Sequence, residues 1–328
     1  MVEPHLAATL RGEHSAGEFA DLLRIYPSRA GKLLRPVICL ATAEALGVDP
    51  KRVARFAAAL ELLHNGFLIH DDFEDGSQLR RGEPTLHRLL GAPLAVHLGD
   101  ALLLRAFSHA FFAAASSPAG AAAVAELQRA ATTTEEGQAL DLLARGRELD
   151  HIARREYYEI VLKKTSAYTT LLPMKVAAAF AGVTSNELLG GLSRFALFCG
   201  LGFQVQDDLR SFGSSGLNGK SPAEDLLEGK ITLPLIRFFE VAEHGPKERA
   251  CAFFANSRPE RDPAEANWLA GRLVESGCIT HSREVAYVAA AKARQAWSRL
   301  ERHLVPSAGA TLLAEMACPP ENSPSQTH

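Results

Sequence analysis

The stretch FLIHDDFED, residues 67–75, places four carboxylates within five residues, directly after an apolar run. Leu60, His64, Phe67, Asp71 and Asp75 recur at steps of three or four, which predicts that they share one face of a helix. Like charges at this spacing repel by about 0.2–0.5 kcal/mol per pair, and removing carboxylates from water costs far more. We therefore expect a cationic partner, and a hard divalent cation suits carboxylate oxygens.

The rest of the chain is typical of packed helices. Hydrophobic residues make up 47% of the 328 residues but aromatic residues only 7%, so the core must consist mainly of Ala, Leu and Val. Helical patterns cover residues 36–47, 49–75, 97–115, 121–131, 137–143, 157–182 and 186–208. We predict one all-α domain over residues 1–317, a mobile loop over 211–222 and a disordered tail over 318–328.

Charge and composition limit the possible partners. A net charge of −3 argues against a nucleic-acid binder, and no apolar run reaches the roughly 18 residues of a transmembrane segment. We see no signal peptide after Met1. The five cysteines are scattered and suit a reducing compartment. We expect a soluble cytoplasmic protein.

A second acidic pair, Asp207-Asp208, follows the apolar residues 201–205. Ser211 stands one turn after Asp207, where an acid could complete the site, and Asp225 and Glu228 follow at a short distance. A single acidic run can be a solvated helix end. Two such runs, each directly preceded by apolar residues, favour two metal sites.

Basic residues could hold phosphates beside these acids. Lys32 and Arg35 flank the expected start of a helix at Pro36, where free N–H groups favour an anion. Arg80 and Arg81 suit bidentate phosphate contacts. Further candidates are Lys164 with Thr165, Lys220 and Lys230, and His64 lies on the face of Asp71. Each alone could be a surface charge, but together with the acids they predict a metal–diphosphate site. No nucleotide-binding P-loop and no serine nucleophile motif is present.

In this order the motifs resemble those of the trans-isoprenyl diphosphate synthases, also called polyprenyl synthetases. The matching segments over residues 30–235 are GKLLRP (31–36), LIHDDFED (68–75), LRRGEPTLH (79–87), KT (164–165), GFQVQDD (202–208), GK (219–220) and EGKITLP (228–234). The resemblance implies a bundle of long helices around a deep central cavity, a homodimer, and two aspartate motifs that face each other across the cavity mouth.

The implied reaction condenses isopentenyl diphosphate head-to-tail with an allylic diphosphate, using Mg²⁺, with three ions expected beside the bound diphosphate. The allylic diphosphate ionises, the double bond attacks the carbocation, and a proton is lost. The implied Mg²⁺ ligands are Asp71, Asp75 and Asp207, supported by Asp72, Asp208 and Asp225. The implied contacts to isopentenyl diphosphate are Lys32, Arg35, His64 and Arg81, and those to the allylic diphosphate are Arg80, Lys164 and Lys230, with Lys220 as a further candidate. Thr165 and Gln204 would steady the reacting ends.

Two positions depart from the family pattern. Leu33 stands where the family usually has arginine, and Ser211 where the second motif often has a third aspartate. The resemblance implies that product length is set by side-chain bulk in the cavity below the first motif. Phe67 lies one turn below Asp71, whereas Gly66 lacks the aromatic side chain often found there in short-chain enzymes. We predict a C20 product, geranylgeranyl diphosphate, and leave C15 and longer chains open.

Two other functions fit part of the pattern. A class I terpene cyclase also ionises a diphosphate, but its second motif would need a glutamate where this chain has Ser215, and it would not need Lys32, Arg35 and His64. A non-catalytic subunit of a heteromeric synthase would be expected to lose metal ligands, whereas Asp71, Asp72 and Asp75 are intact.

Overall fold

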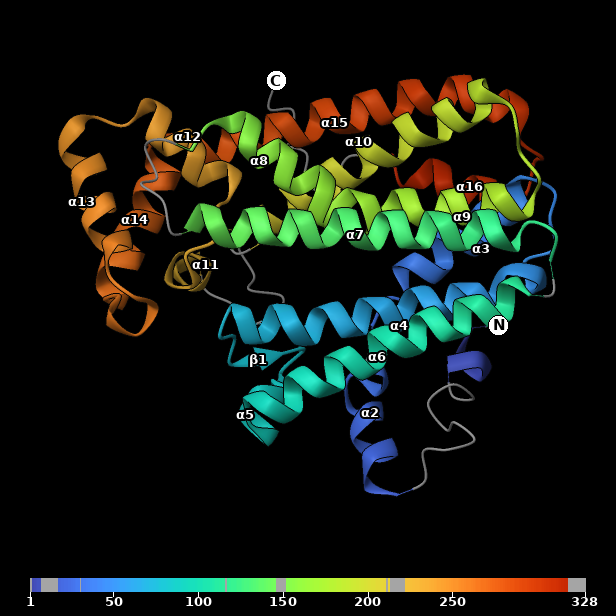
Figure 1. Ribbon diagram of the computed structural model, residues 1–328. Helices are drawn as coiled ribbons and strands as arrows, with labels where there is room; N and C mark the ends of the chain where they lie inside the picture. Colours follow the sequence, from blue (N-terminus) through green and yellow to red (C-terminus); the bar gives the residue numbers. More distant parts are fainter. Residues whose placement is uncertain are drawn as a thin grey trace. The chain divides into compact units, whose positions relative to one another are not determined.

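The computed structural model describes residues 2–6, 17–29, 31–115, 117–145, 152–210, 212 and 222–317. These residues are almost entirely helical (Figure 1), which confirms the predicted all-α fold. The expected tail at 318–328 lies outside the described residues, as does the expected loop at 211–222 except for residues 212 and 222. The extent of a single domain over residues 1–317 stays a prediction.

The elements follow one another along the chain in this order: α2 (Glu18–Ser28), α3 (Leu34–Ala45), α4 (Lys51–Glu74), β1 (Leu79–Arg80), β2 (Glu83–Pro84), α5 (Leu86–Leu90), α6 (Ala92–Ala114), α7 (Gly120–Arg145), α8 (Arg154–Ile160), the π-helix η2 (Val161–Leu171), α9 (Leu172–Phe180), α10 (Asn186–Arg210), α11 (Pro222–Glu228), α12 (Leu233–Val241), α13 (His244–Ala255), η3 (Arg258–Glu260), α14 (Pro263–Glu275), α15 (Cys278–Leu300), η4 (Glu301–His303) and α16 (Ala308–Glu315). Their contacts divide into two compact units. Unit 1 comprises Met1–Ala130, Thr169–Ser193 and Arg299–Glu315, and unit 2 comprises Ala131–Tyr168, Arg194–Ser298 and Met316–His328.

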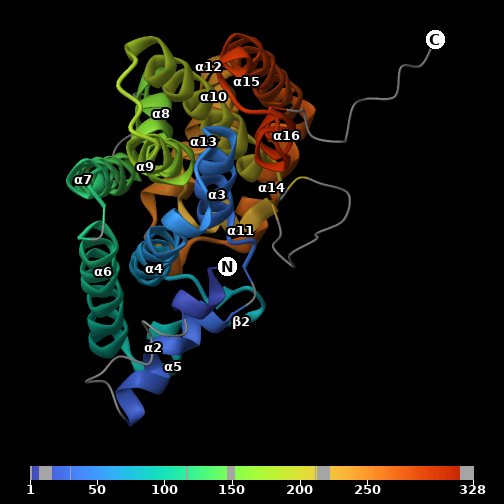
Figure 2. The same cartoon turned by 90° about the vertical axis from the view of Figure 1, so that its right-hand side faces the viewer.

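Helix α4 is the centre of unit 1, where it contacts α2, α3, α5, α6 and α9. It lies side by side with α6 (Figure 1 and Figure 2). Small residues allow this close approach. A Cβ atom on Gly66 of α4 would lie 2.7 Å from a methyl group of Leu103 on α6, and one on Gly99 of α6 would lie 2.3 Å from the His70 ring of α4. Each helix thus places a side chain over a glycine of the other, Leu103 of α6 over Gly66 and His70 of α4 over Gly99.

A short hairpin follows α4. Strands β1 and β2 pair antiparallel, with Arg80 opposite Glu83. Both residues of the connecting turn have positive φ, 57° for Arg81 and 81° for Gly82. This is the pattern of a type I′ turn, whose twist matches that of paired strands. The hairpin therefore places two consecutive arginines at the turn, directly beyond the acidic end of α4.

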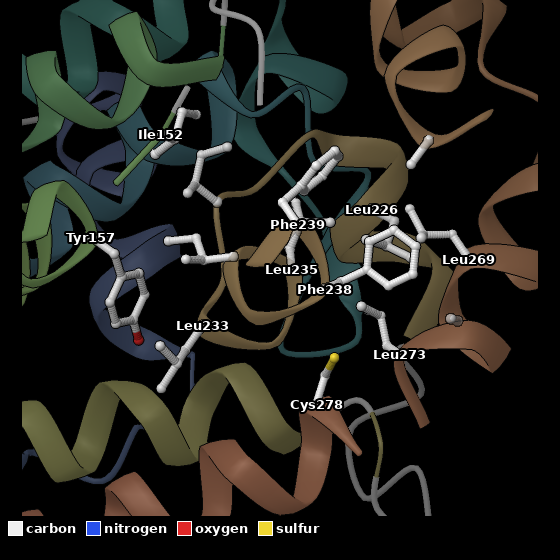
Figure 3. Packing of buried hydrophobic residues seen from close by; sticks show 14 of the residues in the cluster. Ile152, Tyr157, Leu226, Leu233, Leu235, Phe238, Phe239, Leu269, Leu273 and Cys278 are labelled. Atoms are coloured by element: carbon white, nitrogen blue, oxygen red, sulfur yellow. The ribbon is translucent and has the colours of Figure 1, made fainter. Parts of the chain in front are cut away.

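The core of unit 2 is an apolar cluster around α12 (Figure 3). Leu233, Leu235 and Phe238 of α12 are buried together with Leu269 and Leu273 of α14. Helix α14 begins with a regular cap, in which the Asp262 carboxylate accepts the N–H of Ala264 and Pro263 takes the first position. Packing in this cluster fixes Leu233, the first residue of α12. Its backbone N–H donates to Asp208 of the second acidic motif.

Element boundaries differ from the sequence-based expectations in several places, and residues 157–182, expected as one helix, are divided among α8, η2 and α9. Helix α3 begins at Leu34, so Pro36 lies within its first turn and not at its first position. Segments 121–131 and 137–143 belong to one continuous helix, α7, because no residue between them breaks a helix. No helix or strand was predicted between residues 75 and 97, yet residues 80–84 contain most of the hairpin, since the turn at Arg81-Gly82 allows strand pairing.

Within the described residues, α10 is the one helix long and apolar enough to cross a membrane by length and composition. Buried helices of soluble proteins pass the same test, and α10 contributes Phe195, Ala196 and Val205 to the buried core.

Candidate active site

The first acidic motif, residues 71–75, occupies the last turn of α4 and the residue after it. The helix ends in a Schellman motif at Gly76 (φ 59°). The Gly76 N–H bonds to the Phe73 carbonyl at 3.0 Å, and the Ser77 N–H bonds to the Asp72 carbonyl at 2.9 Å. A helix carries partial negative charge at this end, and the last turn contains no basic residue. The carboxylates therefore need cations from outside the helix.

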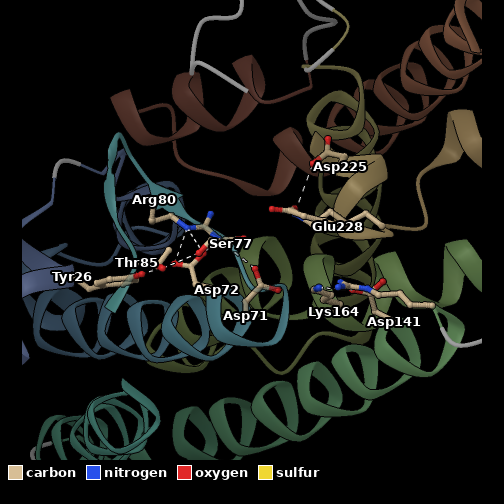
Figure 4. Close-up of polar contacts among 12 residues, drawn as sticks. Tyr26, Asp71, Asp72, Ser77, Arg80, Thr85, Asp141, Lys164, Asp225 and Glu228 are labelled. Carbon is tan, nitrogen blue, oxygen red and sulfur yellow. Dashed lines mark hydrogen bonds and ion pairs between the residues drawn. The ribbon is translucent and has the colours of Figure 1, made fainter. Parts of the chain in front are cut away.

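The carboxylate of Asp72 is buried and receives two donors (Figure 4). The Tyr26 hydroxyl donates to it from α2, and Arg80 donates through Nε at 2.8 Å and also through Nη2. Burial alone would lower the pKa of Arg80, but the hydrogen bonds and charge of Asp72 raise it above its ordinary value. In this arrangement Asp72 orients Arg80, and its predicted role as a metal ligand stays a prediction.

Asp71 is placed differently from its neighbour. Its side chain is 25% exposed and lies 3.5 Å from Arg80. Asp75 is buried one turn later, and its N–H bonds to the Asp71 carbonyl at 2.8 Å. Glu74 is exposed. The structure thus separates the adjacent acids into the partly exposed Asp71 and the enclosed Asp72.

The guanidinium of Arg81 lies against the segment that begins at Gly31. Its Nη1 donates to the carbonyl of Arg29 at 2.8 Å. A Cβ atom on Gly31 would lie 2.9 Å from an Arg81 nitrogen, so the absence of a side chain at Gly31 makes room for the guanidinium. Lys32 follows directly and is exposed. Arg81 thereby lies against Gly31, the residue that precedes Lys32.

Arg35 and His64 extend this basic cluster. Arg35 lies buried in the first turn of α3 and donates to the Thr169 hydroxyl at 2.7 Å. Burial lowers the pKa of His64 well below its ordinary value, and the charges of Arg35 and Arg81 lower it further. His64 is therefore a neutral imidazole at pH 7, surrounded by fixed cations.

Glu61 balances the cluster and was not singled out from the sequence. It is buried on α4, where Asn65 donates to its backbone carbonyl at 2.7 Å. Burial raises the pKa of Glu61, and the charges of Arg35 and Arg81 oppose this shift. Its position three residues before His64, one turn away within an otherwise apolar run, is the signal that could have identified it.

In unit 2, the two acids of the second motif also differ in exposure. Asp207 is 48% exposed and pairs with Arg210 at 2.7 Å. Asp208 is buried and accepts hydrogen bonds from the Tyr157 hydroxyl at 2.8 Å, from Gln204 at 2.9 Å and from the Leu233 N–H at 3.0 Å. Burial raises the pKa of Asp208 to about 7, although all three donors oppose the shift.

Lys164 and Thr165 lie on the π-helix η2, a form of helix often found at functional sites. Lys164 donates to Asp141 of α7 at 2.7 Å (Figure 4). Thr165 donates to the Gln204 side chain at 2.7 Å, so Gln204 links Thr165 to Asp208. Thr165, Gln204 and Asp208 therefore form a hydrogen-bonded chain, whereas Lys164 pairs with Asp141 and Asp207 pairs with Arg210.

Lys230 lies beside two acids at the end of α11. Its Nζ is 2.7 Å from Glu228 and 3.8 Å from Asp225. The Glu228 carboxylate is fully buried and also lies 3.5 Å from Arg258. Lys220, predicted as a phosphate contact, lies outside the described residues, as does Ser211.

The acidic residues fit a site for Mg²⁺ that is completed by its substrate. They offer carboxylate oxygens, the ligands that Mg²⁺ prefers. Among the residues that the structure describes, no three His, Cys, Asp or Glu side chains gather into a metal-binding cluster. Mg²⁺ commonly takes only one or two protein carboxylates and fills its shell with phosphate oxygens and water. The partly exposed Asp71 suits this open arrangement.

Comparisons with known proteins agree with these features. The polyprenyl synthetase family model matches residues 17–267. The chain is 35% identical over 271 residues to a geranylgeranyl pyrophosphate synthase of Geoglobus acetivorans, covering 82% of this chain and 81% of that protein. It is 37% identical over 237 residues to a short chain isoprenyl diphosphate synthase of Methanothermobacter thermautotrophicus, covering 72% and 71%.

Among solved structures, the chain resembles a polyprenyl synthase from Caulobacter crescentus CB15 that was crystallised with calcium and isoprenyl diphosphate. The TM-score is 0.83 at 28% identity, covering 96% of this chain and 92% of that one. The chain therefore belongs to the polyprenyl synthetase family, whose members use Mg²⁺ with diphosphate substrates, and is a prenyl transferase.

Proposed function

We propose that this enzyme joins isopentenyl diphosphate head-to-tail to an allylic diphosphate and makes the C20 product geranylgeranyl diphosphate. One observation carries the proposal: unit 1 holds an anionic helix end at Asp71 and Asp75 and a separate cationic cluster at Arg35 and Arg81. A metal-bound diphosphate and a metal-free diphosphate need these two different environments. The relatives named as geranylgeranyl pyrophosphate synthases support the C20 product.

The acids act on the allylic substrate. Asp71, Asp75 and Asp207 would hold three Mg²⁺ ions, with Asp72, Asp208 and Asp225 in support. When bound, Mg²⁺ neutralises the allylic diphosphate and stabilises it as a leaving group. Arg80, Lys164 and Lys230 donate to its oxygens while the allylic C–O bond breaks and its electron pair stays with the diphosphate, and Lys220 is a further candidate for substrate binding.

The basic cluster of unit 1 acts on isopentenyl diphosphate. Lys32, Arg35 and Arg81 bind its diphosphate, and the neutral His64 donates a hydrogen bond from its ring. This positions the double bond to form the new C–C bond at the allylic carbon. A carbon of the isopentenyl unit then loses a proton, which passes to the departing diphosphate. Thr165 and Gln204 steady the reacting ends.

Product length depends on the space along α4 below Asp71. We propose that Phe67, one turn before Asp71, forms the floor of the cavity. Gly66 is covered by Leu103 of α6, so an aromatic side chain is not needed at this position to fill the space. A C15 or a longer product would place the floor elsewhere.

The assembly and location belong to the same proposal. Helix α6 exposes Leu104, Phe111 and Phe112 (69%, 59% and 65%), which share one face at helical spacing. We propose that this face is part of a homodimer interface of a soluble cytoplasmic enzyme. Sedimentation of Phe112→Asp tests the interface: the variant should sediment as a monomer, and an unchanged dimer contradicts this assignment.

Product analysis tests the reaction. The purified chain is incubated with Mg²⁺, isopentenyl diphosphate and a C5, C10 or C15 allylic diphosphate. Formation of a C20 diphosphate from each primer is expected, and a shorter or longer product corrects the chain length. A hydrocarbon or alcohol formed from geranylgeranyl diphosphate alone would favour a terpene cyclase. Lack of activity that a partner chain restores would favour a non-catalytic subunit.

A further inference from the structure

Arg29, the residue directly after α2, contacts the hairpin that carries Arg80 and Arg81. The side chain of Arg29 is only 4% exposed. Its Nη2 donates to the Pro84 carbonyl at 2.7 Å, and its Nε lies 3.3 Å from the Glu83 carboxylate. Arg29 therefore contacts both residues of strand β2.

Tyr26 and Arg29, at the C-terminal end of α2 and directly after it, also contact Arg81 and the carboxylate that binds Arg80. The backbone carbonyl of Arg29 accepts the hydrogen bond from Arg81 at 2.8 Å. The Tyr26 hydroxyl donates to Asp72, the carboxylate that holds Arg80 (Figure 4). The Arg29 guanidinium stacks on the buried Tyr26 ring at 4.5 Å from its centroid, which joins the two contacts into one unit.

The hairpin needs such support. Its strands are only two residues long, and an isolated two-stranded hairpin is marginally stable at best. Arg81 adopts a left-handed backbone conformation, φ 57°, which costs a residue with a side chain roughly 1–2 kcal/mol. Adjacent guanidinium groups also repel each other. A backbone conformation of this kind persists only when its surroundings enforce it.

We propose that Tyr26 and Arg29 are positioning residues, which hold Arg80 and Arg81 in their diphosphate-binding orientation before substrates arrive. We call this pair the α2 clamp. The identity of the ligands rests on the proposed function. The clamp itself rests only on the contacts within unit 1, so the clamp and the proposed function can be refuted separately.

Limited proteolysis tests the clamp without substrate or metal. Trypsin cleaves after arginine, and cleavage after Arg80 or Arg81 requires the hairpin to open. In Arg29→Met, loss of the hydrogen bond to Pro84 and of the ion pair should speed this cleavage roughly tenfold, as expected for one charged hydrogen bond. The matched control is Arg24→Met on the same helix, whose charge pairs with the exposed Asp21. The hairpin of this control variant should be cleaved at the wild-type rate.

Binding and kinetics test the positioning role. Arg29→Met should raise the Kd of isopentenyl diphosphate, measured by calorimetry without Mg²⁺, roughly tenfold through misplacement of Arg81. Tyr26→Phe removes one oxygen atom. It should raise the KM of the allylic diphosphate severalfold, with a smaller change in kcat, because Arg80 loses its fixed partner. Arg29→Lys keeps the charge and should restore part of the affinity.

Each result decides between distinct outcomes. Equal cleavage after Arg81 in Arg29→Met and wild type would overturn the clamp. Faster cleavage with an unchanged Kd would overturn the positioning role, as would a lowered Tm of Tyr26→Phe with unchanged KM values. If Arg29→Met does not fold, Tyr26→Phe decides alone. Lack of isopentenyl diphosphate binding by the wild type would instead contradict the proposed function.

Discussion

Gly137 of α7 packs directly against the backbone of η2, the π-helix that carries Lys164 and Thr165. A Cβ atom at Gly137 would lie 2.3 Å from the Lys164 backbone nitrogen and 2.7 Å from the Lys163 carbonyl carbon. Ordinary contacts between such atoms begin near roughly 3.5 Å. In Gly137→Ala the backbone of η2 must therefore move by roughly 1 Å, since no flexible side chain can yield instead.

A shift of this size at catalytic groups can lower the rate about 100-fold. Stability should change much less. The crowding costs about 1–3 kcal/mol, and alanine regains about 1 kcal/mol of helix propensity. We therefore expect Gly137→Ala to lower kcat about 100-fold while its Tm falls by only a few degrees.

The measurements are steady-state kinetics with isopentenyl and allylic diphosphates, together with thermal unfolding. The matched control is Gly271→Ala on α14, where an added Cβ would meet no atom within 4 Å. It should keep full activity and gain about 1 kcal/mol of stability. Wild-type turnover in Gly137→Ala would refute the reasoning, because η2 would then tolerate displacement from α7.

Three further predictions follow from the site and the core. Asp71→Ala and Asp207→Ala should each lower kcat by about 10³-fold or more with little change in Tm, whereas Glu74→Gln should not; near-normal turnover in either Asp variant would exclude that residue as a metal ligand. Phe67→Ala should lengthen the product in chromatographic analysis, and an unchanged length would exclude Phe67 as the cavity floor. Burial lowers the pKa of His109 to about 4. Between pH 6.5 and 4, His109 is therefore protonated in the unfolded state but stays neutral in the folded state. Stability to denaturant should thus fall by up to about 3 kcal/mol as the pH drops from 6.5 to 4, and His109→Gln should remove most of that fall; the same slope in both proteins would refute the assignment.

Local sequence patterns predicted a helix well where its own apolar periodicity was enough to define it. The period of apolar residues before Asp71 placed a long helix over 49–75, and α4 runs over Lys51–Glu74. The hairpin was missed because its strands are too short to show an alternating pattern. Gly82 after Arg81 was its only local signal, and the two-residue strands leave little else to detect.

The sequence identified the candidate residues, but it did not show that their environments differ. Asp71 and Asp72 are adjacent and chemically identical, yet one side chain is 25% exposed and the other 1%. Successive residues of a helix point about 100° apart, so only the packing around α4 decides which acid is enclosed. The same holds for Asp207 and Asp208 on α10.

The sequence by itself determined the helical fold, the two acidic motifs and the basic residues, because these depend on local periodicity and on residue type. Only the tertiary structure decided which acid orients an arginine and which remains accessible to a cation. Tyr26 and Asp72 are separated by 46 positions, and Arg29 and Pro84 by 55. Contacts over such separations leave no local pattern, because folding brings the two segments together only when the helices pack.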